Sequence, residues 1–99
     1  MNLMKLNEDL EYSANGKYFC KCCGYNTLIE FPNGTYEICK ICFWEDDNYQ
    51  NENPNEKGGP NRVSLIQARK NFEEFGACEI EMKINVRKPN EDEIRKKMD

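Results

Sequence analysis

Two pairs of cysteines constrain this sequence more than any other feature. Cys20 and Cys23 form one C-x2-C pair, Cys39 and Cys42 form a second, and fifteen residues separate them. Two cysteines on a tight turn can aim both sulfurs at one ion, and two such turns complete a tetrahedron. The spacing therefore predicts one structural Zn²⁺ ion bound by four thiolates. Closed coordination leaves no position for water or substrate, so the site is not expected to be catalytic.

The composition indicates why such a chain needs a metal. With 99 residues, 38% apolar and 32% charged, there is room for one domain and little material for its core. The absence of histidine excludes Ser-His-Asp and Cys-His nucleophilic sites and His-ligated catalytic zinc. A net charge of −4 has the wrong sign for binding phosphates, so a nucleic-acid-associated zinc ribbon is only an alternative. We expect no enzymatic activity.

The location expected for this chain is the cytoplasm. Residues 1–17 are predicted to be an N-terminal extension without a signal peptide, and no apolar run is long enough to enter a membrane. Thiols stay reduced in the cytoplasm, so the cysteines are interpreted as metal ligands. Disulfides are the alternative in an oxidising compartment.

Turn chemistry predicts a β-hairpin between the two cysteine pairs. Two β-prone runs, 25–31 and 35–39, flank Asn33-Gly34, which favours the positive φ angles of a tight turn. Residues 46–62 are rich in asparagine, proline and glycine and are predicted to be a loop.

The second half of the chain contains one well-marked helix. Ser64 can cap its first turn, Gly76 can end it, and an apolar stripe lies between them, which predicts a helix over 64–75. Alternating apolar residues over 80–86 predict a further strand. Residues 89–99 form a charged tail with helical ion-pair spacing. The expected class is α+β, a small zinc-ribbon-like hairpin with one packed amphipathic helix and a further strand.

The sequence also resembles a known family, the bacterial cysteine-rich CPCC proteins, over about residues 18–89. The shared motifs are Cys20-Lys21-Cys22-Cys23-Gly24-Tyr25, Tyr36-Glu37-Ile38-Cys39, Cys42-Phe43-Trp44-Glu45-Asp46-Asp47 and Gly58-Gly59-Pro60-Asn61. Lys21 stands where the family usually has proline. The resemblance implies a metal-binding domain over 18–88 and no established activity.

The segment after the last cysteine suggests a role in protein binding. Trp44, Glu45, Asp46 and Asp47 combine a large aromatic side chain with three carboxylates, which could contact a partner with a basic surface. An inhibitor or immunity-type protein would have this size and charge. In the alternative interpretation the aromatic side chains cover the metal site and the acids begin a turn.

Two further functions remain open for the cysteines. Cys22 lies between two ligands and beside Lys21, surroundings that can make a thiol reactive toward oxidants. The first knuckle is also similar to that of rubredoxin, which would favour iron and electron transfer. Phe43 occupies the position of the second knuckle's glycine, which makes that half less regular. Cys78 is expected to pack as a small apolar residue.

Overall fold

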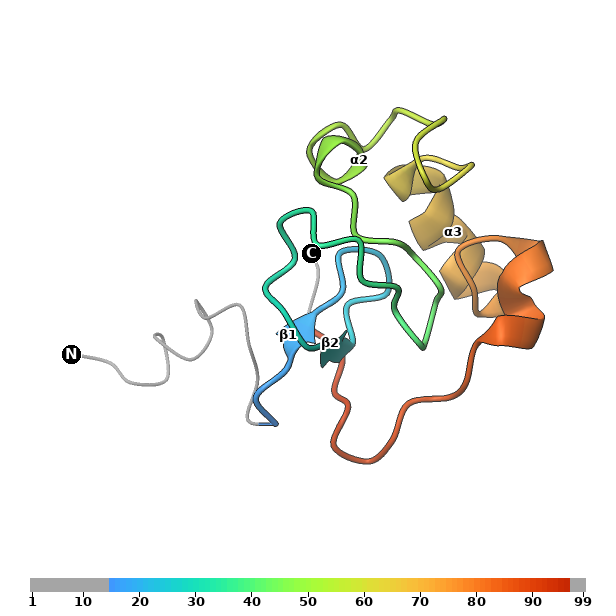
Figure 1. Ribbon diagram of the computed structural model, residues 1–99. Helices are drawn as coiled ribbons and strands as arrows, with labels where there is room; N and C mark the ends of the chain where they lie inside the picture. Colours follow the sequence, from blue (N-terminus) through green and yellow to red (C-terminus); the bar gives the residue numbers. More distant parts are fainter. Residues whose placement is uncertain (1–14, 97–99) are drawn as a thin grey trace.

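The computed structural model of the chain describes residues 15–96, which form a mixed fold of short strands and helices (Figure 1). Its elements are β1 (Tyr18–Phe19), β2 (Asn26–Leu28), α2 (Asn48–Glu52), α3 (Leu65–Phe75) and a 3₁₀ helix, η1 (Ile80–Asn85). The predicted α+β class, with a zinc-ribbon-like hairpin and packed helix, is confirmed. Most of the predicted N-terminal extension and the last three residues lie outside the described range. Within 15–96, no helix is long and apolar enough to cross a membrane.

The hairpin does not lie where Asn33-Gly34 predicted it. Antiparallel β1 and β2 pair Tyr18 with Leu28, so the hairpin encloses the first cysteine pair instead. The turn at Gly34 forms, but its N–H and that of Thr35 donate to Asp46 Oδ2 at 3.0 and 2.8 Å. The backbone of this turn bonds a distant carboxylate rather than a facing strand. Residues 35–39 form no full strand, but Ile38 makes an isolated antiparallel bridge with Glu45 across the second knuckle.

The helix predicted over 64–75 is confirmed as α3. Ser64 Oγ accepts a hydrogen bond from the N–H of Gln67 at 3.1 Å, and Gly76 ends the helix in the left-handed conformation with φ of 88°. Leu65 and Ala68 are fully buried on its inner face. The helix therefore packs its apolar stripe onto the cysteine core.

The segment predicted to be a loop contains the short helix α2. Asp47 caps it by accepting from the N–H of Gln50 at 2.9 Å. The Gln50 side chain is fully buried, and its Nε2 donates to three backbone carbonyls, those of Glu56, Asn61 and Val63. The segment 46–62 is thus ordered by polar side chains, which hydrophobic periodicity does not reveal.

The further strand predicted over 80–86 was wrong, because this segment forms η1. The C-terminal residues extend the hairpin instead. The N–H of Lys96 donates to Gly24 O at 2.7 Å, and Asn26 and Ile94 exchange hydrogen bonds through the Asn26 N–H and side chain. The helix considered for the tail is absent from residues 89–96. Alternating apolar residues alone therefore do not make a strand.

The core of the domain consists largely of thiols. Trp44, Leu28, Ile41 and Leu65 are its largest apolar side chains, each at most 2% exposed. All six cysteines are buried among them. With so few large apolar residues, the centre of this fold is the cysteine cluster itself.

Candidate metal centre

Four cysteine side chains converge on one point inside the domain. The Sγ atoms of Cys20, Cys23, Cys39 and Cys42 all lie within 4.8 Å of one another. Cys20 and Cys42 are 3.6 Å apart, and Cys23 and Cys39 are 3.7 Å apart. Four sulfurs placed about 2.3 Å from one ion in a tetrahedron would be separated by about 3.8 Å. The cluster therefore has the size that a four-thiolate metal site requires, and it could hold a metal ion.

The two knuckles have the same backbone conformation. The N–H of Gly24 donates to Cys20 O at 2.9 Å, and the N–H of Phe43 donates to Cys39 O at 2.8 Å. Gly24 has φ of 82° and Phe43 has φ of 73°. The second knuckle is therefore as regular as the first, contrary to the expectation from its missing glycine, and phenylalanine adopts a left-handed conformation that suits glycine better.

Each sulfur also lies near a backbone N–H two residues later in the chain. The N–H groups of Cys22, Tyr25, Ile41 and Trp44 point at the sulfurs of Cys20, Cys23, Cys39 and Cys42 at 3.4 to 3.5 Å. Thr27 Oγ1 adds a contact of 3.1 Å to the Cys39 sulfur. Donors around a sulfur favour the thiolate, which is the form that binds metal.

Interactions among the four thiols shift their pKa values in different directions. The pKa of Cys39 is lowered well below its usual range, first by hydrogen bonding to Cys20 and then to Cys23 and Cys42. The pKa of Cys20 is raised, first by its bond with Cys23, and that of Cys42 is raised, first by burial. Bonding to Cys20 lowers the pKa of Cys23, but the other two cysteines and burial together raise it. The neighbouring thiols and burial therefore act in opposite directions on these pKa values.

Arginine side chains hold the first knuckle from outside. Arg69 on α3 donates through Nε and Nη2 to Lys21 O, at 3.0 and 2.8 Å. Arg95 Nε donates to Cys23 O at 2.7 Å, and its guanidinium carbon lies 5.3 Å from the centre of the Phe72 ring. Two cations thus lie beside a knuckle whose sulfurs would carry negative charge in a metal complex.

Backbone groups hold the second knuckle. The N–H of Cys78 donates to Cys42 O at 2.7 Å, and the N–H of Arg87 donates to Lys40 O at 3.1 Å. The segments before and after η1 therefore hold the two sides of this knuckle without using a side chain.

The remaining cysteines do not complete a reactive site at the surface. Cys22 is 1% exposed and Cys78 is 3% exposed. Burial, more than the nearby Cys22 and Glu79, raises the pKa of Cys78 to about 12. The neutral thiol is therefore the stable form of Cys78, which packs in the core. The burial of Cys22 gives no support to its predicted reactivity.

The four residues predicted to bind a partner do not form one exposed surface. Trp44 and Asp46 are each only 2% exposed. Trp44 lies in the core, with Nε1 donating to Asn51 Oδ1 at 3.1 Å, and Asp46 accepts from the turn at Gly34. Glu45 and Asp47 are half-buried. Trp44 therefore belongs to the covering of the cysteine cluster, the alternative that its position beside Cys42 suggested.

Sequence analysis missed the residues that surround the cluster. Thr27, Arg69 and Arg95 contact the knuckles from segments up to 72 residues away along the chain. No local pattern marks such residues. The one usable signal for Thr27 was its place in a β-prone run directly after the first knuckle.

Comparison with known families supports the site from an independent direction. The family model described as "Cysteine-rich CPCC" matches residues 18–93, which include all four clustered cysteines and most of the chain. No curated protein matches the sequence. The match also includes residues 89–93, just before the tail residues that bond to the hairpin.

Proposed function

We propose that this chain, which belongs to the cysteine-rich CPCC family, is a non-enzymatic protein-binding module folded around one structural Zn²⁺ ion. The observation that carries the metal assignment is the convergence of four buried sulfurs, each with a backbone N–H directed at it. All four ligands are at most 2% exposed, which supports a structural role because substrate has no access to the ion. Thiolate ligands also require a reducing location, such as the cytoplasm.

Metal analysis tests the first half of the proposal. Protein purified without added metal should contain one zinc per chain and should not absorb visible light. Iron bound by four thiolates absorbs strongly in the visible, so colour with stoichiometric iron would favour the rubredoxin-like alternative instead. A folded protein with neither metal would contradict the proposal.

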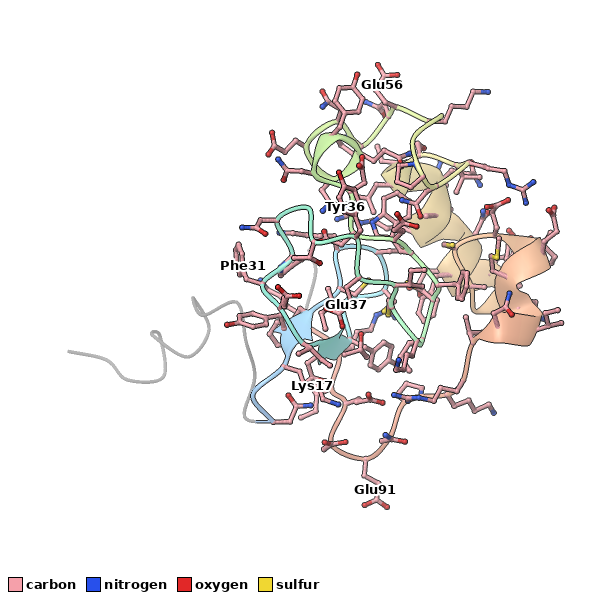
Figure 2. All side chains as sticks on the ribbon, viewed as in Figure 1. Lys17, Phe31, Tyr36, Glu37, Glu56 and Glu91 are labelled. Carbon is pink, nitrogen blue, oxygen red and sulfur yellow. The ribbon has the colours of Figure 1, made fainter. Side chains whose placement is uncertain are left out.

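An acidic surface beside the second knuckle supports the binding role. Residues 29–49 contain five acids and one base, and of the acids Glu30 is exposed, Asp46 is buried and the other three are half-buried. Phe31, Tyr36 and Tyr49 on the same stretch are 41%, 63% and 61% exposed, and Phe31 projects from the edge of the molecule (Figure 2). Exposed aromatic side chains among carboxylates fit a protein partner with a basic surface, as in an inhibitor or immunity-type protein. Trp44 and Asp46 contribute to this surface only by holding its turn in place.

Affinity capture with matched variants tests the binding role. The zinc-loaded chain should retain a basic protein from an extract of its source cells, and retention should fall as salt rises. Tyr36→Ser with Glu30→Gln should weaken retention, whereas Glu74→Gln on α3 should not. Retention that ignores both salt and the paired substitutions would rule out this surface.

A further inference from the structure

Two apolar hollows lie on either side of residues 83–88. This segment lies against the second knuckle, where the Arg87 N–H donates to Lys40 O. One, of about 490 Å³, is lined by Ile38, Phe43 and Ile84 among others. The other, of about 410 Å³, is lined by Phe72 and Phe75 among others. Val86 and Arg87 line both hollows, so the hollows adjoin across these two residues, and we call the pair the two-lobed groove.

The groove exposes two aliphatic side chains that lie outside the core. Ile84 is 90% exposed and Ile38 is 41% exposed. Phe43 lines the same lobe while its backbone is held at φ of 73°. A non-glycine residue in the left-handed region carries backbone strain, which glycine would avoid at this position. The strained backbone thus keeps an aromatic ring at the groove. At the matching position the first knuckle has Gly24, which has no side chain.

The charged side chains of the groove are all basic. Lys40 lines the first lobe, Lys83 and Lys88 line the second, and no acidic residue lines either. Arg87 is bound by Glu93, but the three lysines are exposed and form no ion pair with any residue of 15–96. In a chain with 18 acids and 14 bases, this lining has the opposite sign to the whole molecule.

We propose that the two-lobed groove binds an acidic peptide segment of another protein, whose apolar side chains enter the two lobes. The lysines supply attraction and orientation, while Ile84, Phe43 and Phe75 supply apolar contact area. A peptide is favoured over a nucleic acid because a phosphate backbone would satisfy the lysines and leave the apolar side chains uncovered. This partner differs in charge from the one proposed for the acidic surface, so the two proposals stand independently.

Selection from a randomised displayed peptide library against the zinc-loaded full chain tests this proposal. Enriched peptides should combine Asp or Glu with Leu, Ile or Phe. Their labelled synthetic forms should bind by fluorescence anisotropy, more weakly as salt rises. Ile84→Ser should lower affinity about tenfold, the loss expected for one buried aliphatic side chain. The charge reversals Lys83→Glu with Lys88→Glu should lower it further.

Matched controls and a competitor define the outcomes that overturn it. Ile29→Ser changes an equally apolar residue that is 73% exposed on the loop after β2, and it should leave affinity unchanged. Lys70→Glu on α3 serves the same purpose for charge. The proposal fails if no peptide is enriched, if enriched peptides are neutral or basic, or if the controls weaken binding equally. It also fails if a single-stranded oligonucleotide binds as tightly as the best peptide.

Discussion

The two cysteine knuckles share one backbone geometry and differ in what maintains it. Both close with an N–H bond of 2.8 or 2.9 Å to the carbonyl of their first cysteine. The first knuckle uses Gly24 at the left-handed position, and outside it two arginine side chains and the N–H of Lys96, which donates to Gly24 O. The second uses Phe43 at that position and backbone N–H groups outside it.

This difference shows that a knuckle's sequence requirements depend on its surroundings. A glycine makes the left-handed turn at no steric cost, so the arginines outside the first knuckle do not have to offset backbone strain. Phe43 carries backbone strain at this position. The hydrogen bonds on both sides of the second knuckle offset this strain. The absence of glycine therefore does not mean that a knuckle is irregular. Substitutions inside and around each knuckle separate the support from its own residues from the support of the surrounding fold.

Removing the metal should abolish both knuckles at once, the largest effect expected. Binding of structural zinc contributes about 10–16 kcal/mol, whereas a small domain is stable by only about 5–15 kcal/mol. Excess chelator should therefore eliminate near-UV circular dichroism and cooperative thermal unfolding. Cys42→Ser should do the same, and Cys78→Ala, which removes a buried thiol outside the cluster, should retain one metal per chain. A chelated sample that still unfolds cooperatively would contradict the structural role of the ion.

Exchanging side chains at the two left-handed positions should have unequal effects. Gly24→Ala places a Cβ on a backbone with φ of 82° and should lower the free energy of unfolding by about 2 kcal/mol. Phe43→Gly removes comparable strain but also a half-buried ring, so its net effect should stay within about 1 kcal/mol. Denaturant unfolding of the zinc-loaded proteins measures both. If Gly24→Ala and Phe43→Gly lowered the free energy of unfolding equally, the backbone at Phe43 would carry no strain.

How much could be predicted from the sequence depended on how local each signal was. The cysteine pairs and helix α3 are specified by residues a few positions apart, and both were predicted correctly. The hairpin was misplaced because the Asn33-Gly34 turn is bonded by Asp46 rather than by a facing strand. The strand predicted over 80–86 is a 3₁₀ helix, and the tail bridges the hairpin instead, through Arg95 and Tyr25. Long-range hydrogen bonds decided both outcomes, and neither leaves a periodic pattern.

Acid should loosen the support of the second knuckle before that of the first. Arg87, whose N–H holds Lys40 O, binds Glu93 through two hydrogen bonds of 2.7 and 2.8 Å. Hydrogen bonding from Arg87 lowers the pKa of Glu93 from 4.5 to about 2. Because the folded-state pKa is lowered, this stabilisation is complete above about pH 5 and is lost as pH falls toward 2. Glu93→Gln should cost about 2 kcal/mol at neutral pH.

The pH dependence distinguishes this effect from metal release. Protons also compete with the metal for thiolates in acid, and this affects the wild type and Glu93→Gln alike. The difference between their unfolding free energies at each pH should therefore shrink from about 2 kcal/mol toward zero between pH 5 and pH 2. A difference that stays constant would mean that Glu93 stabilises the tail by packing rather than by its charge.

The smallest expected effect concerns the side-chain support of the first knuckle. Arg69→Met keeps most of the apolar stem and removes both hydrogen bonds to Lys21 O, leaving this carbonyl without its charged donor. A loss of about 1 kcal/mol is expected for hydrogen bonds at a half-buried site. Zinc transfer to a competing chelator should become several-fold faster, since the first knuckle can open more often. Lys70→Met, one position along the same helix, should change neither quantity.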